Sequence, residues 1–582
     1  MPSYLAPGVY VEETSFRAPS IEGVGTSTAG FVGPTLTGPI GGTPSILTSF
    51  GDYANIYGDF DNLAISATLA DPKNINYMAL SVKGFFDNGG SVLYVSRVFA
   101  GGAGVGFAKA SDADVTITAA FPGAAGNRSV AISLVATMTP MPTGTTTTLP
   151  QGSLLALVTP PPAAPAPPVP VDYYTNGATG TFKDSGGNSP AGPLAAGAYY
   201  CVLTMQVSTT SASGAPVSWS GLGFDPLHPM YIGNVLGPNP PRSIDALENQ
   251  IQIVVKSGTT AAALQSNIFG SWADPTKVSA KVYTLTGGTD GVEPASIDYD
   301  NALKAFEALE DIAIVAAPGS SIFSQSQAII QSLITHVSRL RAYRVAVLDT
   351  PPNEVAADNE NLRGTIDTSY AALYVPWMTV ANPLAQAGTA IPAQVSVPPS
   401  GYMAGIYARN DQENGVAKAP ANEVVLGALG LERSITFGEQ SVLNPLGINC
   451  IRSFPERGIR VWGARTATSD SEFMYLNVRR YLIYLEHSID NSTQWAVFEN
   501  NGPALWARVR DSVDQFLYSE LQTGNLLGTT PAEAYFVRCD RTTMTQNDLD
   551  NGRMICLIGV ALLKPAEFVI FRIGQFIASA RS

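Results

Sequence analysis

The stretch SDSEFMYLNVRRYLIYLEHSIDNSTQWAVFENNGPALWARVRDSVDQFLYSELQTG, residues 469–524, contains two long segments in which apolar side chains recur at helical spacing. Ser469 followed by Glu472 has the spacing of a capping box, which favours a helix start at this point. The second segment begins at Gly502 and Pro503, and proline is favoured at the first helical position. This part of the chain therefore predicts two long neighbouring helices.

Strand-like apolar runs lie on both sides of these helices. GINCIRSF and GIRVWGAR precede them, and AYFVRC, MICLIGVALL and EFVIFRI follow them. Helices flanked by several short strands can bury a common core. Residues 431–582 are therefore predicted to form a compact α+β domain.

Charged residues mark two parts of this domain. The second helix carries Arg508, Arg510, Asp511 and Asp514 on the side opposite its apolar face, and Glu520 is assigned to the same polar side. The loop that follows carries charges of both signs, at Asp540, Arg541, Asp548, Asp550 and Arg553. A solvated helix face explains such charges as simply as a protein contact does, because the pattern alone names no partner.

Several segments of the chain resemble one known family. They are residues 464–501 and 537–573 near the C-terminus, YLAPGVYVEE and IEGVGTSTAGFVG near the N-terminus, and FFDNGGSVLYVSRV and LTGGTDG between them. These segments resemble contractile tail sheath proteins, a family that phage tails, R-type bacteriocins and extracellular contractile injection systems share. The similarity reaches both ends of the chain and leaves mainly residues 100–284 unmatched.

The resemblance implies a structural subunit. Sheath proteins stack as hexameric rings around an inner tube protein, and the sheath contracts to drive the tube through a target envelope. The resemblance also implies baseplate and terminal cap proteins as partners. It further implies that subunits move as rigid bodies between two sets of contacts, so that the assembly itself stores the mechanical work and no nucleotide is consumed. On this basis the charged helix face, or the charged loop after it, is the hypothesised contact with the inner tube.

The composition is that of a globular protein without a nucleic-acid partner. The chain has 582 residues, of which 45% are hydrophobic, and this length is enough for several domains. Its net charge is −14, and it has no basic cluster of the kind that neutralises phosphates. We therefore expect no nucleic acid among its partners.

The cysteines and the N-terminus predict an intracellular site of synthesis. Four cysteines lack CxxC spacing and are predicted to be buried, reduced thiols: Cys201, Cys450, Cys539 and Cys556. The opening MPSYLAPG lacks the basic and apolar regions of a signal peptide, and no apolar run reaches about 18 residues. We therefore expect assembly in the bacterial cytoplasm, within a phage tail or tail-like particle that can be released, and no membrane insertion.

Both ends of the chain carry strand-like segments without a nearby hairpin partner. The N-terminal arm, residues 1–25, contains Val9, Tyr10, Val11 and Glu12, and the C-terminal arm contains Phe568, Val569, Ile570, Phe571 and Arg572. Each segment is too isolated to bury a face in its own hairpin, so it needs a sheet elsewhere. The residues allow pairing within the chain or with a neighbouring subunit. The resemblance favours the second, because sheath proteins exchange terminal arms that extend the sheet of the C-terminal domain.

Two separated stretches between the arms alternate strands and helices. Residues 26–99 contain a strand, a helix and a strand, and residues 285–430 continue the alternation through AIVAAP, VAVLDTP and AALYVPWM. Such alternation predicts parallel strands joined by right-handed crossovers. The two stretches are therefore predicted to form one discontinuous αβ middle domain, and the resemblance implies that this domain is similar to the subtilisin fold.

Residues 100–284 have a different composition, rich in Gly, Pro, Thr, Ala and Ser. Short runs such as DVTITAAF, SVAISLVAT and QIQIVVK predict strands, whereas TPPPAAPAPPVP predicts a polyproline-like linker or loop. The stretch is therefore predicted to be a β-rich insertion on an outer surface, where insertions disturb a fold least. The fold class expected for the whole chain is a multidomain protein that mixes α/β and α+β domains.

An enzyme is the first alternative to a sheath subunit. GTSTAG, residues 25–30, resembles the segment around the nucleophile of subtilisin-type proteases, with Ser27 as that nucleophile. Those proteases place Asp and His before the serine in the chain, whereas His228, His336 and His487 all follow Ser27. We therefore expect a protein that is not an enzyme and has no catalytic residue.

The sequence gives equally little support for a cofactor or metal site. No Gly-Lys dipeptide of a P-loop occurs, and a glycine-rich turn explains Asp290 in GGTDG without a cation. We therefore expect no metal and no cofactor. A static capsid or surface-layer protein is the remaining alternative, and it is distinguished from a sheath by the shape of the assembly.

Overall fold

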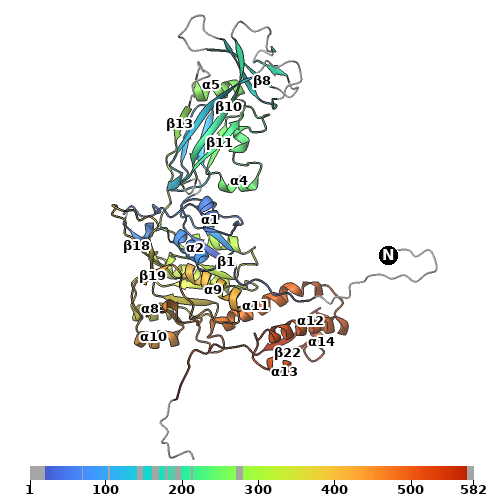
Figure 1. Cartoon of the computed structure of the whole chain (residues 1–582). Helices are drawn as coiled ribbons and strands as arrows, with labels where there is room; N and C mark the ends of the chain where they lie inside the picture. Colours follow the sequence, from blue (N-terminus) through green and yellow to red (C-terminus); the bar gives the residue numbers. More distant parts are fainter. Residues whose placement is uncertain are drawn as a thin grey trace, which may run out of the picture.

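The computed structural model describes residues 20–68, 70–102, 105–139, 149–159, 169–176, 181–184, 188–189, 198–211, 214–270 and 280–572. These residues form three units (Figure 1). A central α/β unit lies between a β-rich insertion at one end and a mainly helical C-terminal lobe at its side. The mixture of sheets and helices agrees with the expected mixed α/β multidomain class.

One eight-stranded sheet organises the central unit, in the order β2-β3-β1-β14-β15-β16-β20-β21. The strands from β3 to β20 are parallel, and β2 and β21 are antiparallel edges. The pairing of β1 with both β3 and β14 joins strands from before and after the insertion. The strands are β1 (Ala29–Gly33), β2 (Ile46–Leu47), β3 (Leu93–Arg97), β14 (Ile314–Ala316), β15 (Val345–Asp349), β16 (Ala371–Val375), β20 (Ile448–Phe454) and β21 (Gly458–Val461).

Helices cover both faces of this sheet, so its inner strands are buried on both sides, as is typical of parallel sheets. One face packs against α1 (Phe50–Tyr57), α2 (Tyr77–Asp87) and α9 (Ser400–Asn414), and the other against α6 (Ser296–Leu303) and α7 (Ser326–Val337). Glycine allows α2 and α9 to approach closely, because a Cβ atom on Gly405 would lie 2.4 Å from the carbonyl oxygen of Phe85. The smaller helix α10 (Phe437–Leu443) packs against β20, and α8 (Ala356–Arg363) packs against α10.

The strands β20 and β21 correct the expected domain organisation. They come from GINCIRSF and GIRVWGAR, which were assigned to the C-terminal domain beginning at residue 431. In the structure β20 pairs in parallel with β16 and therefore belongs to the central sheet. The error arose because short apolar runs do not reveal which sheet they join.

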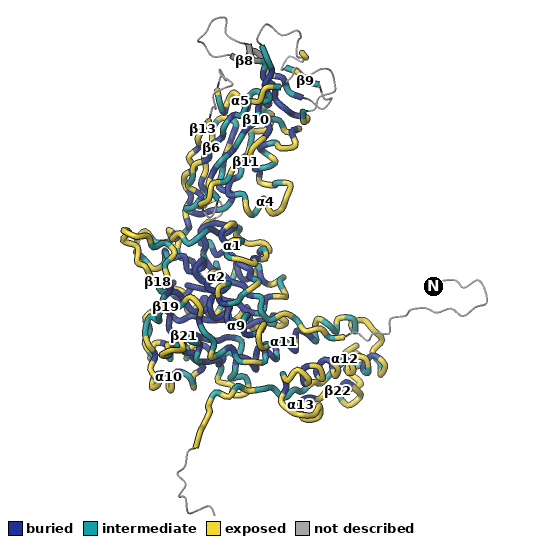
Figure 2. The backbone as a smooth tube through the Cα atoms, viewed as in Figure 1, coloured by how far each residue is buried: buried dark blue, intermediate teal, exposed yellow. Residues whose placement is uncertain are grey.

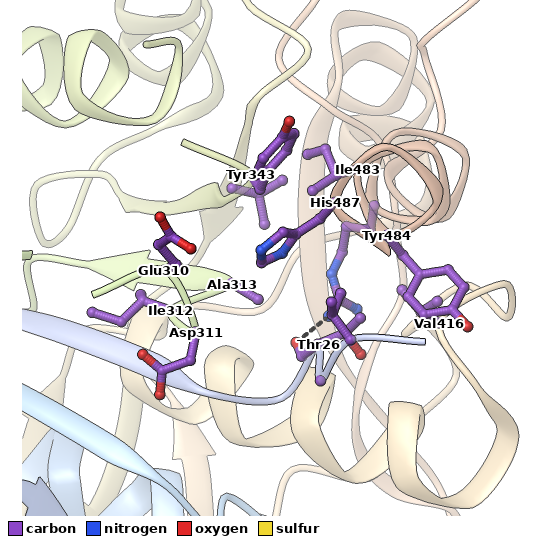
Figure 3. Close-up of a pocket in the computed structure, with 14 residues that line it drawn as sticks. Thr26, Glu310, Asp311, Ile312, Ala313, Tyr343, Val416, Ile483, Tyr484 and His487 are labelled. Carbon is purple, nitrogen blue, oxygen red and sulfur yellow. Dashed lines mark hydrogen bonds between the residues drawn. The ribbon is translucent and has the colours of Figure 1, made fainter. Parts of the chain in front are cut away.

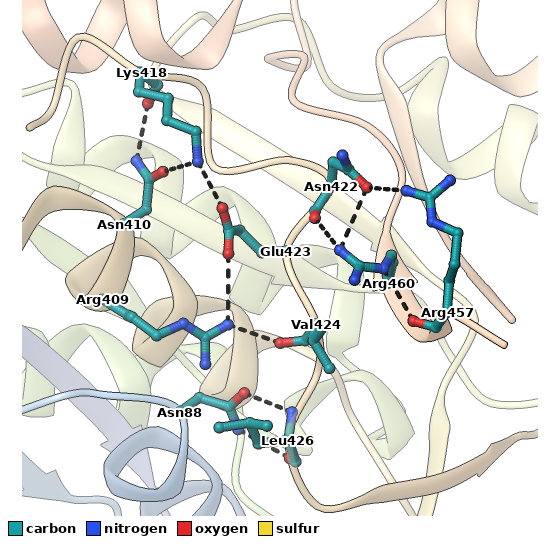
Figure 4. Close-up of polar contacts among 10 residues, drawn as sticks. All are labelled: Asn88, Arg409, Asn410, Lys418, Asn422, Glu423, Val424, Leu426, Arg457 and Arg460. Atoms are coloured by element: carbon teal, nitrogen blue, oxygen red, sulfur yellow. Dashed lines mark hydrogen bonds and ion pairs between the residues drawn. The ribbon is translucent and has the colours of Figure 1, made fainter. Parts of the chain in front are cut away.

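A polar network fastens the segment that leads from α9 toward this sheet edge (Figure 4). Lys418 Nζ donates to Glu423 Oε1 at 2.6 Å, and Arg409 Nη2 donates to the Val424 carbonyl at 2.7 Å. Asn88, at the end of α2, exchanges hydrogen bonds with the backbone of Leu426. The segment continues into a small sheet of β18 (Gln394–Val397), β17 (Met378–Ala381) and β19 (Ala428–Leu431).

Asp349, at the end of β15, caps the N-terminus of α9. Its Oδ1 accepts the Ser400 N–H at 2.8 Å and its Oδ2 accepts the Ser400 hydroxyl at 2.6 Å. The residue before this helix end is Pro399, whose side chain cannot cap it. Burial raises the pKa of Asp349 to about 7, although the bonds from Ser400 lower it.

We expect Asp349→Asn to gain stability over the wild type as pH rises from about 4 to about 7. The pKa of Asp349 is higher in the folded chain than in the unfolded chain, so the carboxyl of the unfolded chain ionises at lower pH. The free energy of unfolding of the wild type therefore falls by about 1.4 kcal/mol for each pH unit between the two pKa values. Asparagine keeps an acceptor for the Ser400 N–H and ionises in neither state. Urea unfolding of both proteins across this pH window measures the difference in their free energies of unfolding. The histidines titrate in both proteins, so their contribution cancels in that difference.

Asp367→Asn is the matched control for this experiment. The pKa of Asp367 is lowered by hydrogen bonds from Ser469, so its ionised form supports the fold and that support is lost toward acid pH. This loss falls at or below the ordinary Asp pKa of about 4, so the difference in stability between wild type and this control should stay nearly constant from pH 4 to pH 7. A constant difference between wild type and Asp349→Asn would contradict the prediction.

The insertion has its own core, formed between two sheets and the helices α3 and α5. The larger sheet contains β6 (Ser129–Thr139), β7 (Leu154–Thr159), β8 (Val169–Asn176), β9 (Phe182–Lys183), β10 (Tyr199–Thr210), β11 (Pro216–Leu222) and β13 (Ala280–Thr284). The smaller sheet contains β4 (Lys109–Ser111), β5 (Val115–Ala119) and β12 (Ile251–Val255). The helices are α3 (Ile232–Val235), α4 (Ser243–Glu248) and α5 (Ala261–Phe269).

The insertion is a β-rich unit, as predicted, but the sequence concealed some of its strands. β7 and β8 pair with each other and flank the proline-rich run, most of which lies outside the described residues. The junction with the central unit is also well packed. Asp290 of GGTDG accepts the Ala64 N–H at 2.7 Å and the Ala124 N–H at 2.6 Å, so one carboxylate joins both units.

The C-terminal lobe is built on the two predicted helices, which are α11 (Leu476–Ser492) and α12 (Pro503–Gln522). The start of α12 at Pro503 agrees with the prediction, whereas α11 begins seven positions later than Ser469. Ser469 instead bonds Asp367 through its hydroxyl and its N–H. Completing the lobe are α13 (Pro531–Ala534), β22 (Tyr535–Arg538), α14 (Gln546–Asp550) and β23 (Leu557–Val560).

Candidate assembly interfaces

The base of the N-terminal arm is held along α11. The Val24 N–H donates to Ser488 Oγ at 3.1 Å, and the Glu22 N–H donates to Ser492 Oγ at 3.2 Å. Gly23 lies so close to Tyr484 that a Cβ atom there would be 2.3 Å from the Tyr484 hydroxyl oxygen. The described part of the arm therefore leaves the central sheet in a fixed direction along this helix.

A buried ion pair fixes the arm where it enters the sheet. Arg480 Nη1 donates to Asp411 Oδ1 at 2.9 Å, and the two side chains are 3% and 4% exposed. Thr26 joins the pair, since its hydroxyl donates to Asp411 Oδ2 at 2.6 Å and its carbonyl accepts from Arg480 Nη2 at 3.1 Å. Thr26 and Arg480 also line the small pocket of Figure 3, where His487 stacks on Tyr343 with ring centres 4.6 Å apart.

The C-terminal segment is anchored at one residue and then leaves the molecule. Glu567 forms an ion pair with Arg465, accepts from Asn444 Nδ2 at 2.6 Å, and accepts from the Tyr475 hydroxyl at 3.2 Å. These bonds lower the pKa of Glu567, against the opposing effect of burial. Beyond Glu567 the segment extends away from the fold (Figures 1 and 2).

The predicted C-terminal strand forms no strand within the described chain. Phe568, Val569, Ile570 and Phe571 are 73%, 69%, 78% and 83% exposed, and Arg572 is also exposed. Four consecutive exposed apolar residues are unusual on a monomer and typical of an interaction segment. The corresponding N-terminal residues, Val9, Tyr10, Val11 and Glu12, lie outside the described residues.

The polar face of α12 is exposed, as predicted, with one exception. Arg508, Arg510, Asp511 and Asp514 are exposed, and three of them take part in surface ion pairs: Arg508 with Glu499 at 3.1 Å, and Arg510 with Asp511 at 2.9 Å. The exception is Glu520, which is buried and accepts the Tyr481 hydroxyl at 2.7 Å and the Tyr484 hydroxyl at 3.0 Å. Glu520 therefore joins α12 to α11 and is not part of the exposed face.

The charged loop packs against the first half of α12. Met544, Leu549 and Met554 from the loop share a core cluster with Leu505 and Trp506 of the helix. The exposed charged residues of the loop are Asp540, Arg541, Asp550 and Arg553. Asp548 is partly buried and closes the capping box of α14 with Thr545. The helix face and the loop thus belong to one side unit of the molecule.

The three histidines considered for catalysis have structural partners. His336 Nε2 lies 3.0 Å from Arg344 Nη1, and burial lowers its pKa to about 3. Within the described residues, the side-chain hydrogen bonds of the three histidines reach Arg344, the Met230 N–H and Asn491, and none reaches Ser27. In the same part of the chain, no group of three or more His, Cys, Asp or Glu is arranged to hold a metal ion.

No described helix is both long enough and apolar enough to cross a membrane. Two family profiles match consecutive parts of the chain. The phage tail sheath protein central domain matches residues 293–467, and the phage tail sheath C-terminal domain matches residues 468–576. The border between them falls after β21, in agreement with the pairing of β20 and β21 with the central sheet. Residues 293–576 therefore belong to the phage tail sheath protein family.

Two relatives with similar sequences are also described as tail sheath proteins. The chain is 24% identical over 278 residues to the tail sheath protein of Vibrio phage KVP40, covering 47% of this chain and 37% of the relative. It is 25% identical over 268 residues to a putative prophage major tail sheath protein of Pseudomonas aeruginosa, covering 45% of this chain and 64% of the relative. The chain thus spans well under the full length of either relative.

The fold is similar to that of a solved sheath complex. The chain is similar to the sheath complex, in its contracted state, of the extracellular contractile injection system PVC, with a TM-score of 0.54 at 20% identity over 100% of both chains. This similarity concerns the fold alone. The alignment spans the whole chain, whereas the two family profiles match only residues 293–576.

Proposed function

We propose that this chain is the subunit of a contractile sheath, which polymerises as stacked hexameric rings around an inner tube protein. Contraction of the sheath drives the tube through a target envelope, and baseplate and terminal cap proteins close the two ends. The observation that carries the proposal is the family match over residues 293–576, together with a fold similar over the whole chain to a contracted sheath. Assembly takes place in the bacterial cytoplasm, and no enzymatic step is involved.

Negative-stain microscopy of the expressed protein tests this proposal. A sheath forms striated cylinders, whereas a capsid or surface-layer protein forms closed shells or flat lattices. Shells or lattices in place of cylinders would overturn the proposal. Incubation with a broad peptide substrate tests the hydrolase alternative. A similarity of the central unit to the subtilisin fold would not by itself indicate catalytic activity, because one fold can serve many functions.

Strand exchange between subunits is the second part of the proposal. The exposed apolar residues 568–571 have no strand partner among the described residues, and the base of the N-terminal arm is fixed along α11. The described part of the lobe offers a sheet of only two strands, β22 and β23. Because two-stranded sheets are marginal alone, strands donated by neighbouring subunits would stabilise this sheet through backbone hydrogen bonds.

The third part of the proposal is that the charged side of the lobe contacts the inner tube. Replacing Arg508, Asp511 and Asp514 together by alanine should leave sheath rings intact but reduce the yield of tube-bound, extended particles. Exposed ion pairs contribute about 0–1 kcal/mol each, so the substitutions should cost the fold little. Counting extended particles by microscopy measures the effect.

Lys83 and Asp87 supply a matched control for the tube contact. They form an exposed ion pair on α2 of the central unit, 47% and 44% exposed. Replacing both by alanine removes surface charge away from the lobe and should leave the particle yield unchanged. A normal yield of extended particles from the α12 variant would exclude this helix face as the contact.

The insertion should be dispensable for polymerisation. It begins after Ala100 and returns at Val292, and these residues form an antiparallel bridge in which the Val292 N–H donates to the Ala100 carbonyl at 3.0 Å. Removing residues 101–289, with a short Gly-Ser linker, keeps both bridge residues and keeps Asp290 for the Ala64 N–H. We expect cylinders by microscopy. Folded monomers that fail to assemble would show that the insertion belongs to the lattice contacts.

A further inference from the structure

Cys539 and Cys556 lie opposite each other at the end of the β22–β23 ladder. The last paired residues are Arg538 and Leu557, so the next step along both strands brings the two cysteines face to face. The two thiols are close enough to influence each other's pKa, and neither is part of a disulfide. Cys539 is 2% exposed and Cys556 is half-buried, so one of the two sulfurs remains partly accessible.

The strand register gives these cysteines a spacing that suits a disulfide. The Ala561 N–H donates to the Ala534 carbonyl at 2.7 Å, which marks Ala534 and Ala561 as a hydrogen-bonded pair of the ladder. Hydrogen-bonded and non-hydrogen-bonded pairs alternate, so Cys539 and Cys556 occupy a non-hydrogen-bonded position, where Cα atoms are about 4.5 Å apart. Disulfides need Cα atoms about 4.4–6.8 Å apart. The register therefore places the two Cα atoms within the range that a disulfide requires.

We propose that Cys539 and Cys556 form a disulfide by exchange with a low-molecular-weight disulfide such as oxidised glutathione. The bond would enclose residues 540–555, which contain α14 and the charged loop residues Asp540, Arg541, Asp548, Asp550 and Arg553. The thiol chemistry is independent of the proposed sheath function. Its consequence for the tube contact rests on that function.

The exchange balances in two steps. The thiolate of the more accessible Cys556 attacks one sulfur of the small disulfide and releases the other half as a thiolate, which takes up the proton that Cys556 lost. The Cys539 thiolate then attacks the Cys556 sulfur of the mixed disulfide and releases the second half, which takes up the Cys539 proton. Two protein thiols are oxidised, and one small disulfide is reduced to two thiols.

Burial controls the rate of this reaction. It raises the pKa of Cys556 to about 12, and it raises that of Cys539, which the neighbouring Cys556 thiol partly offsets. Few thiolates are therefore present at neutral pH, so exchange should be slow there and faster at alkaline pH. A reducing cytoplasm would keep the pair as thiols during assembly, and slow oxidation would follow in a less reducing solution.

The neck of the enclosed loop is already held in place next to the thiols. Thr543 Oγ1 donates to the Ile555 carbonyl at 2.7 Å, and the Arg553 N–H donates to the Asp548 carbonyl at 2.7 Å. Asn501 Nδ2, just before α12, donates to the Arg553 carbonyl at 3.1 Å. The disulfide would therefore lock a loop conformation that exists in the reduced chain, and it would limit the motion of the charged loop against α12.

Peptide mapping of the full-length chain tests the proposal. The purified protein is incubated with oxidised glutathione at mildly alkaline pH, unfolded and treated with an alkylating reagent. We expect the peptides that contain Cys539 and Cys556 to be joined and unalkylated. Cys201 and Cys450 are buried and are internal controls that should remain thiols. Alkylation of all four cysteines after long exposure, or glutathione attached to Cys556 without the internal bond, would overturn the proposal.

Thermal unfolding gives a second readout. Oxidation should raise the Tm of the wild type and of Cys201→Ser, because the closed loop restricts the unfolded chain. Cys539→Ser and Cys556→Ser should show no such rise, and the partly exposed Cys556 is the substitution less able to disturb the core. A rise of equal size in Cys556→Ser would contradict the assignment. Neither measurement involves polymerisation, so failure of the sheath proposal would leave both results interpretable.

Discussion

Replacing Asp411 by alanine is expected to lower the free energy of unfolding by about 3–5 kcal/mol, because it leaves the buried guanidinium of Arg480 without its counter-charge. The two side chains are only 4% and 3% exposed, so solvent cannot replace the lost carboxylate. The substitution also removes the acceptor of the Thr26 hydroxyl. Urea unfolding of the full-length chain, followed by tryptophan fluorescence, measures the loss.

Glu499→Ala is the matched control for this prediction. It removes the partner of Arg508 in a pair that is 46% and 52% exposed, and such a pair contributes about 0–1 kcal/mol. Removing both buried charges, by Asp411→Leu with Arg480→Met, should cost less than Asp411→Ala, because no unpaired charge remains buried. A loss below about 1 kcal/mol for Asp411→Ala would mean that water reaches the pair.

The position of this pair connects stability to assembly. Arg480 belongs to α11, Asp411 to α9 and Thr26 to the segment between the N-terminal arm and β1. Loss of the pair would therefore loosen the base of the arm as well as the contact between the lobe and the central unit. An Asp411→Asn variant that remains folded but polymerises poorly would agree with this role.

Patterns along the chain predicted the elements whose causes are local. α12 begins at Pro503 as expected, because a proline at the first helical position and an apolar stripe are both visible in the sequence. The alternation of strands and helices likewise predicted the parallel strands from β1 to β16, whose side chains are buried on both faces.

The errors concern residues whose partners are distant in the sequence. Ser469 has the spacing of a helix cap, but the carboxylate of Asp367 bonds its hydroxyl and N–H, so α11 starts later. Glu520 has the spacing of the exposed face of α12, but the hydroxyls of Tyr481 and Tyr484 reach it across the lobe. Only the packed structure reveals these partners, because helical periodicity describes a helix by itself.

The cysteine pair was hidden for the same reason. Cys539 and Cys556 lack any recognisable spacing, and each was expected only to be a buried thiol. Their proximity follows from the register of β22 on β23, and the turn between these strands gives no short hairpin signal that fixes the register in advance. Aligning the two apolar runs AYFVRC and MICLIGVALL as antiparallel strands could have predicted that the two cysteines are close.

Removal of residues 568–582 is expected to abolish sheath polymerisation while the chain stays folded. Phe568, Val569, Ile570 and Phe571 are 69–83% exposed, so deleting them removes few contacts within the chain. Glu567 and its bonds to Arg465 and Asn444 are retained. In the assembly, a donated strand would form about five backbone hydrogen bonds, each contributing ~0.5–1.5 kcal/mol net. Loss of several kcal/mol at every junction between subunits is enough to prevent assembly.

A pair of substitutions separates backbone pairing from side-chain contact in this segment. Ile570→Pro removes one N–H donor and should reduce polymerisation, whereas Ile570→Val keeps the donor and the β-branched shape and should assemble normally. Circular dichroism checks that each monomer is folded, and sedimentation measures assembly. If Ile570→Pro and the truncated chain both form cylinders of ordinary length, the segment is not a shared strand. If Ile570→Val fails as severely as Ile570→Pro, the isoleucine side chain and not the backbone carries the contact.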